Sequence, residues 1–174
     1  MYIGHVGVAL AAKRLRVAVG LLVLLVSTYA PDWIDSGLCI VGSYDPRQML
    51  SHSIPAVLVF ALVGFLVYTA ITRDRVGGAL IAAVIVSHML LDWITGTKPT
   101  WPGGPTIGLQ LYSHPIGDFV AEGVVIAIGA IVYARTLPPR RRPWLDLTIM
   151  LGALLALQLT IDVAHLVFKS LPKC

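Results

Sequence analysis

Six apolar runs, separated by charged or proline-containing turns, organise the chain. They cover residues 2–12, 17–30, 54–72, 76–95, 116–134 and 144–168. The last four are 19 to 25 residues long, which matches the roughly 20 residues that a helix needs to cross the hydrocarbon core of a bilayer. Each of these four runs is therefore predicted to be a transmembrane helix.

The first two runs are too short to span a membrane singly. We expect them to form a helical hairpin that turns at "KRLR", residues 13–16. One continuous helix over residues 2–30 is the alternative, but it would bury three basic side chains mid-span at several kcal/mol each. A cleaved signal peptide is a further alternative, because "KRLR" is followed by an apolar run and "STYA". The apolar stretch before the charges and Pro31 after the run argue against it.

The composition supports a membrane protein. The 174 residues are 57% hydrophobic and 13% charged, whereas soluble domains are about 25% charged. We therefore predict an all-α fold: a polytopic membrane helix bundle of about five to six helices, forming a single domain over residues 1–174. The expected partner is the lipid bilayer of a prokaryotic inner membrane, which the chain crosses several times. No nucleic acid partner is expected, and the sequence leaves the oligomeric state open.

Basic residues gather in every second connection between the apolar runs. Three connections carry them: Lys13, Arg14, Arg16, Arg73, Arg75, Arg135, Arg140, Arg141 and Arg142. Alternate connections share one side of a membrane, and the side rich in Lys and Arg is the cytoplasmic one. Lys169 and Lys173 fall on the opposite side and weaken this bias slightly.

The opposite, non-cytoplasmic end of the predicted bundle receives all five histidines and most of the acidic residues. The histidines are His5, His52, His88, His114 and His165, and the acids are Asp32, Asp35, Asp45, Asp92, Asp118 and Asp162. Ionisable side chains inside a membrane bundle indicate function by default, because their burial is costly. Their convergence on one end predicts a common site.

Two of the histidines precede an aspartate by four residues, His88 before Asp92 and His114 before Asp118. Residues four apart share one face of a helix, so each pair can offer a nitrogen and a carboxylate to one ion. Asp162 and His165, three apart, are a third possible pair. Each pair alone could be a histidine bonded to a nearby carboxylate. "PDWID", residues 31–35, could simply end a helix and cap the next, and His52 could neighbour an N-cap.

The convergence of these groups favours a metal site over those readings. Cys39 and Cys174 have no CxxC spacing, so any metal is expected to be held by imidazole and carboxylate ligands. Zinc accepts both at about 2.0–2.2 Å.

The ordered motifs "PDWID", "SHS" and "HMLLDWITG" resemble the family of membrane-bound metal-dependent hydrolases, which includes the LexA-regulated inner-membrane proteins. That family in turn resembles the zinc-dependent phospholipase C and nuclease superfamily, helical enzymes that cleave phosphoesters with three zinc ions. The resemblance covers most of the chain. It implies two or three divalent ions, with zinc expected, and a set of metal ligands: His5, Asp32 (alternatively Asp35), His52, His88, Asp92, His114 and Asp118, with Asp92 bridging two ions.

The sequence departs from the family in two places. The superfamily has a further histidine after the one matched by His88, whereas "TGTKPTW", residues 95–101, has none. A third ion is then absent, or uses Asp162 and His165. Family members also often carry His-Arg before the second motif. Here "DPRQMLSHS" carries only Arg47, whose planar fork suits a substrate phosphate.

These observations predict a membrane-embedded metal-dependent hydrolase that acts on a phosphoester or phospholipid-like substrate at the non-cytoplasmic interface. Asp92, Asp32 and Arg47 are the expected catalytic residues. Arg47 and Trp101 are the expected substrate-binding residues, with Trp101 in a lid loop over residues 95–114. The alternatives are a divalent metal-ion transporter and a non-catalytic membrane protein stabilised by a metal. Whether Asp35, Glu122, Asp162 and His165 take part is left open.

Overall fold

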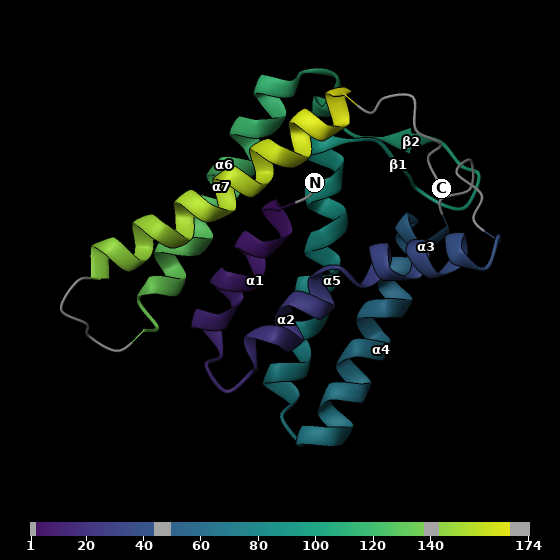
Figure 1. The fold of residues 1–174 in the computed structure, drawn as a ribbon. Helices are drawn as coiled ribbons and strands as arrows, with labels where there is room; N and C mark the ends of the chain where they lie inside the picture. Colours follow the sequence, from purple (N-terminus) through teal and green to yellow (C-terminus); the bar gives the residue numbers. More distant parts are fainter. Residues whose placement is uncertain (1–2, 44–49, 138–142, 168–174) are drawn as a thin grey trace.

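The computed structural model describes residues 3–43, 50–137 and 143–167, with the side chains of Pro143 and His165 excepted. In this part of the chain it is an all-α bundle, as predicted (Figure 1). The helices are α1 (Gly4–Leu15), α2 (Leu21–Thr28), α3 (Ala30–Ile40), α4 (Ile54–Thr72), α5 (Arg75–Thr95), α6 (Pro115–Ala134) and α7 (Pro143–Val167), with short 3-10 turns at Leu50–His52 (η1) and Leu111–Ser113 (η2).

Four helices are long and apolar enough to cross a membrane. They are α4, α5, α6 and the Trp144–Ala164 part of α7, and they coincide with the four predicted spans. Local sequence sets their ends: Pro55 and Pro115 stand in the first turns of α4 and α6, where the missing N–H costs nothing. The Asp74 carboxylate accepts a 3.0 Å hydrogen bond from the Gly77 N–H and caps α5.

The first two apolar runs form a hairpin, as predicted, and not one long helix. The α1 helix ends at Leu15 and α2 begins at Leu21. The Lys13 ammonium holds the turn between them by donating to the carbonyls of Val17 at 2.5 Å and Val19 at 2.7 Å. The basic turn is therefore stabilised by satisfying backbone carbonyls beyond the end of α1.

Pro31 does not end the second run as the sequence suggested. A bend at Tyr29 is followed directly by α3, with Pro31 in its first turn. Asp32 and Asp35 consequently lie within a helix, and neither caps one. In Figure 1, α3 crosses the end of α4 at a steep angle. Its Asp32 and Asp35 side chains contact His52, which lies just before α4.

Glycines let α1 pack closely against α6. A side chain at Gly129 would place its Cβ 2.0 Å from the Gly7 carbonyl oxygen, and one at Gly7 would lie 2.4 Å from the Val125 oxygen. Such small residues allow membrane helices to approach backbone to backbone. The α1 helix thereby lies in the bundle between α6 on one side and α2 and α5 on the other.

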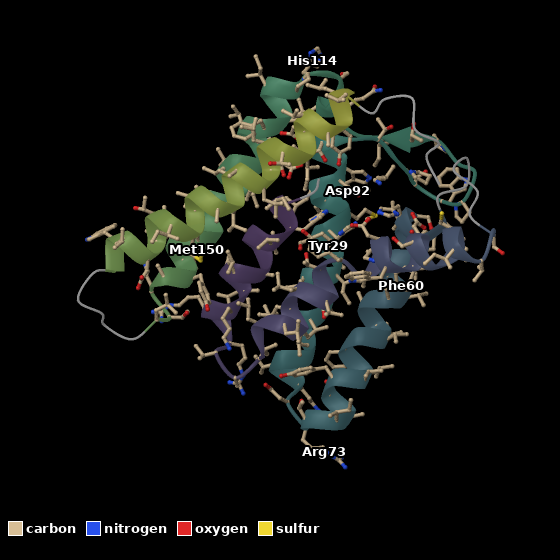
Figure 2. All side chains as sticks on the ribbon, viewed as in Figure 1. Tyr29, Phe60, Arg73, Asp92, His114 and Met150 are labelled. Atoms are coloured by element: carbon tan, nitrogen blue, oxygen red, sulfur yellow. The ribbon has the colours of Figure 1, made fainter. Side chains whose placement is uncertain are left out.

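The basic turns share one end of the bundle, opposite the histidine-rich end. Arg16 Nε lies 3.1 Å from Asp74 Oδ2, which joins the α1–α2 turn to the α4–α5 turn. Figure 2 shows Arg73 at this end and His114 at the other. Arg140–Arg142, Lys169 and Lys173 lie outside the described residues.

The loop after α5 folds over the histidine-rich end. It contains a short β-hairpin that the sequence did not predict, in which β1 (Lys98–Pro99) pairs antiparallel with β2 (Thr106–Ile107). The Leu109 N–H donates to the Trp93 carbonyl at 2.7 Å, and the Ile54 N–H donates to the Thr100 carbonyl at 3.1 Å. These bonds fix the hairpin to the ends of both α5 and α4.

Cysteine labelling in intact cells tests the orientation of the bundle. We expect Ser113→Cys to react with an impermeant maleimide from outside and Thr136→Cys to react only after the membrane is permeabilised, because the arginine-rich turns face the cytoplasm. Cys39 is disulfide-bonded, so the unreduced parent chain serves as the blank. Labelling of Ser113→Cys from the cytoplasm alone would reverse the assignment.

Candidate metal centre

Five of the predicted metal ligands meet at the histidine-rich end of the bundle. They come from four elements, His5 from α1, Asp32 from α3, His52 from η1, and His88 and Asp92 from α5. His5 and His88 are fully buried, and His52 and Asp92 nearly so, whereas the Asp32 side chain is 42% exposed. The site is thus closed toward the bundle and open at Asp32.

The side chains form two overlapping groups that could each hold an ion. One consists of His5, His88 and Asp92, and the other of Asp32, His52 and His88, with the ligand atoms of each group within 4.8 Å of one another. Asp92 faces both groups: its Oδ1 lies 3.3 Å from His5 Nε2, and its Oδ2 lies 3.4 Å from His52 Nε2. A carboxylate placed in this way suits the bridging role predicted for Asp92.

The spacing of the donor atoms fits a small divalent cation. Ligands bound to one tetrahedral zinc ion lie roughly 3.3–3.6 Å apart, as follows from bond lengths near 2.1 Å. His88 Nε2 lies 3.5 Å from Asp92 Oδ2 and 3.6 Å from Asp32 Oδ1. Because one imidazole nitrogen binds one ion, His88 can serve only one of the two groups at a time.

Hydrogen bonds to the outer ring nitrogens fix how two of the imidazoles face the site. His88 Nδ1 donates to the Thr28 carbonyl at 2.7 Å, and His52 Nδ1 lies 2.9 Å from Asp35 Oδ2. Ser51 Oγ bonds the other Asp35 oxygen and holds that carboxylate in place. Partners of this kind set the tautomer and orientation of metal-binding histidines. Asp35, which the sequence left undecided, therefore positions His52.

The two inner nitrogens then face each other. His88 Nε2 and His52 Nε2 are 3.2 Å apart, so the two nitrogens either share a proton in a hydrogen bond or both face a bound cation. His5 Nε2 faces Asp92 Oδ1 at 3.3 Å, and its Nδ1 is buried without a hydrogen bond in the described part of the chain. These residues fit a divalent metal ion.

The pKa values of two groups outside the membrane spans, Asp32 and His52, are shifted in the directions that favour a positive charge between them. Burial acts to raise the pKa of Asp32, but the hydrogen bond to His52 and the nearby imidazoles outweigh it and lower that pKa below its ordinary value. Burial acts to lower the pKa of His52, but its bonds to Asp32 and Asp35 outweigh it and raise that pKa. A proton on His52 Nε2 therefore satisfies the same carboxylate that a metal ion would, and metal binding must release it.

Lys98, in β1, is a site residue that the sequence analysis missed. Its Nζ lies 3.1 Å from Asp92 Oδ2, and its side chain is only 14% exposed. The sequence predicted a missing ligand and a substrate-binding Trp101 in the segment "TGTKPTW" and assigned its lysine no role. A lysine in a loop shows no periodic signal, so only the folded hairpin reveals that it reaches the site.

The structure does not bring His114 or Asp118 into this cluster. Pro115 follows His114, and a residue before proline is pushed out of helical geometry; His114 has φ −126° and ψ 80°. The two residues therefore do not form the expected helical pair. His114 is exposed and lies well above Asp92 in Figure 2, whereas Asp118 is buried on α6.

The remaining candidates lie apart from the cluster or cannot be placed. Trp101 is 56% exposed in the hairpin loop and packs over Gly104. Asp162 accepts a 2.8 Å hydrogen bond from Gln158 on its own helix. Arg47 and the side chain of His165 lie outside the described residues, so the substrate contact and the third pair predicted for them are not addressed by the structure.

Glu122 has a different role from the metal ligands. Its Oε2 accepts a 2.9 Å hydrogen bond from the Gly4 N–H, and Gln158 Oε1 accepts one of 3.1 Å from the Ile3 N–H. Both bonds are buried and satisfy N–H groups at the start of α1 that the helix itself leaves unpaired. Since His5 follows Gly4 directly, α6 and α7 position this ligand through the end of its helix.

Replacement of Glu122 tests this positioning role. Glu122→Leu leaves the Gly4 N–H buried without its acceptor, at about 1–3 kcal/mol, so we expect a lower unfolding temperature in detergent and weaker zinc binding. Glu122→Gln keeps a carbonyl acceptor and should retain most of both. If the two variants bind zinc equally well, Glu122 does not act through His5.

The metal content of an Asp92 variant tests whether this carboxylate is a metal ligand. Asp92→Asn keeps the size of the side chain but removes the charge that faces three imidazoles. We expect its zinc affinity to fall by at least the roughly 10- to 100-fold that loss of an outer partner costs. His114→Ala, an exposed histidine at the same end of the bundle, is the control and should keep full metal content by elemental analysis. Metal loss in His114→Ala would show that the site is larger than the described cluster.

Three comparisons place the chain among known proteins. No curated protein matches it, and no solved structure matches it. A model of the YdjM inner membrane protein family matches residues 1–166, nearly the whole chain. This agrees with the four candidate spans and with the predicted likeness to the LexA-regulated inner-membrane proteins. The chain therefore belongs to the YdjM inner membrane protein family and is a multi-pass protein of the inner membrane.

Proposed function

We propose that the protein is a metal-dependent hydrolase that acts on a phosphoester, with a phospholipid-like molecule as the favoured substrate, at the non-cytoplasmic face of the membrane. The observation that carries the proposal is the convergence of three imidazoles and two aspartates from four separate elements on one buried cluster. Ordinary helix packing does not require this convergence, and the donor types are those that zinc accepts.

The residues of the cluster have different roles in the proposed reaction. His5, His52 and His88 offer neutral nitrogen ligands, and Asp92 offers one carboxylate oxygen to each group. A bound divalent cation supplies Lewis-acid polarisation and a nucleophile at neutral pH. Asp32 is the ligand nearest to solvent, with 42% of its side chain exposed, so substrate and water are expected to enter beside it.

This opening favours catalysis over a purely structural metal. A structural zinc site is closed by four protein ligands, whereas a catalytic site keeps a position for water or substrate. In the described cluster the buried ligands lie on the bundle side and the exposed aspartate lies on the outer side. The arrangement supports access from the non-cytoplasmic side.

The surroundings of the site support a lipid substrate. The two segments that supply Asp32 and Lys98, α3 and the stretch from the end of α5 to η2, carry exposed aromatic and aliphatic side chains: Trp33, Ile34, Trp101, Ile107, Leu109 and Tyr112. Tryptophan and tyrosine side chains are enriched at the level of the lipid headgroups. A substrate held in the membrane would therefore meet the cluster without leaving the interface.

A transporter is less well supported by the placement of the polar groups. In α5, His88 and Asp92 lie in the last two turns, and in α6, Asp118 and Glu122 lie in the first two. The remaining length of these two helices and all of α4 contain no ionisable side chain suited to binding a divalent ion in mid-membrane. A transport pathway would place such groups near the bilayer midplane.

A substrate screen with metal removal tests the proposed function. We expect purified protein in detergent to hydrolyse bis(p-nitrophenyl) phosphate or phospholipids in mixed micelles, to lose this activity with a chelator, and to regain it with zinc. Asp92→Asn should lose activity by at least about 100-fold, as expected for a ligand of the reacting ion, while His114→Ala retains it. Zinc-loaded, folded protein that turns over no phosphoester would contradict the proposal, and zinc uptake into proteoliposomes would favour the transporter.

A further inference from the structure

The Lys98 ammonium is placed to form an ion pair with Asp92 while no metal ion is bound. It cannot keep this ion pair once Asp92 binds a metal ion. The ammonium lies 3.1 Å from Asp92 Oδ2 and is largely shielded from solvent. The same oxygen faces His52 and His88 at 3.4 and 3.5 Å. A divalent cation held by Asp92 and either imidazole would therefore compete with the ammonium for one oxygen.

The backbone that carries Lys98 is fixed, so the side chain is the part free to respond. Lys98 pairs with Ile107 across the hairpin. The hairpin is tied to α5 by the Leu109–Trp93 bond of 2.7 Å and to α4 by the Ile54–Thr100 bond of 3.1 Å. Lysine places a compact charge on a flexible four-carbon stem, which can turn away from Asp92 without displacement of the loop.

An ammonium beside a bound dication needs a new negative partner. Like charges repel strongly where solvent screening is weak, and a largely buried charge is costly unless it is paired. In the described cluster Asp32 and Asp35 are already engaged with His52. Among the described residues of the cluster no carboxylate is left for Lys98, so an anion that enters at the solvent-open side of the site can take this place.

We propose that Lys98 is the anion-binding residue of the site: it pairs with Asp92 in the absence of metal, and with a phosphate-type oxyanion once a divalent cation occupies Asp92. The inference rests on the proposed function and specifies its substrate as a phosphate-bearing anion. Phosphate and its esters are suited to the position because they are held by an ammonium and a metal ion together.

The proposal predicts two effects of opposite sign from one substitution. Lys98→Gln removes a cation that competes with metal, so zinc affinity should rise roughly tenfold. The same change removes the anion partner, so the affinity of zinc-loaded protein for inorganic phosphate should fall roughly tenfold or more. A lysine that only anchors the hairpin would lower thermal stability but would not move the two affinities in opposite directions.

The experiment uses the full chain in detergent or nanodiscs. Zinc affinity is measured by competition with a chromophoric chelator, and phosphate affinity by calorimetry on zinc-loaded protein, for the parent, Lys98→Gln and Lys98→Arg. Lys98→Arg keeps the charge and should restore phosphate binding in large part. Arg75→Gln removes one positive charge at the cytoplasmic end and is the control, with both affinities expected to stay unchanged.

A second arm separates the two possible sources of the anion. Zinc-loaded protein is tested for binding of phosphatidic acid in phosphatidylcholine nanodiscs, beside free inorganic phosphate. A Lys98-dependent gain for phosphatidic acid over free phosphate assigns a lipid headgroup, and equal dependence at equal affinity assigns a soluble phosphate compound.

The outcomes distinguish this inference from the proposed function. If folded Lys98→Gln leaves both affinities unchanged, Lys98 is a structural partner of Asp92 and the inference is wrong while the hydrolase proposal stands. Lys98-dependent phosphate binding without turnover of any phosphoester supports the inference and counts against the hydrolase. A parent protein that takes up no zinc overturns both.

Discussion

The buried carboxylate of Asp92 is the constraint on which the rest of the site depends. A charge in a membrane bundle is tolerated only when it is compensated nearby, and Asp92 lies one turn before the end of α5 with only 3% of its surface exposed. His5, His52 and Lys98 each reach it from a different element. The N-terminal hairpin, the segment before α4 and the loop after α5 must therefore all fold over the same point.

The contacts of α1 with the rest of the bundle position His5 beside Asp92. Gly7 and Gly129 let the backbones of α1 and α6 approach closely, and the acceptors on Glu122 and Gln158 hold the first N–H groups of α1. A short helix that does not span the membrane gains little from lipid and needs such tertiary anchors. Polar groups within the bundle thus serve two purposes, since some form the candidate metal centre and others position it.

The site combines rigid and adjustable parts in a way that suits chemistry on an anion. The imidazoles of His52 and His88 are fixed by hydrogen bonds on their outer nitrogens, so their inner nitrogens are already oriented. Such preorganisation lowers the cost of binding an ion or a developing charge. Lys98 and Asp32 stand at the outer side, where a long flexible stem and an exposed carboxylate can respond to what enters.

The sequence by itself determined the parts of this protein that depend on local pattern. Apolar length set the four spans, charges set the N-terminal hairpin, and the helical period correctly paired His88 with Asp92, because both lie within α5. The same period failed for His114, since Pro115 forces it out of the helix. Only the tertiary structure decided that Asp35 orients His52, that Glu122 anchors α1, and that Lys98 reaches Asp92. Those contacts join segments with no common periodicity, and only the packing of the helices together with the hydrogen-bonded hairpin brings them into contact.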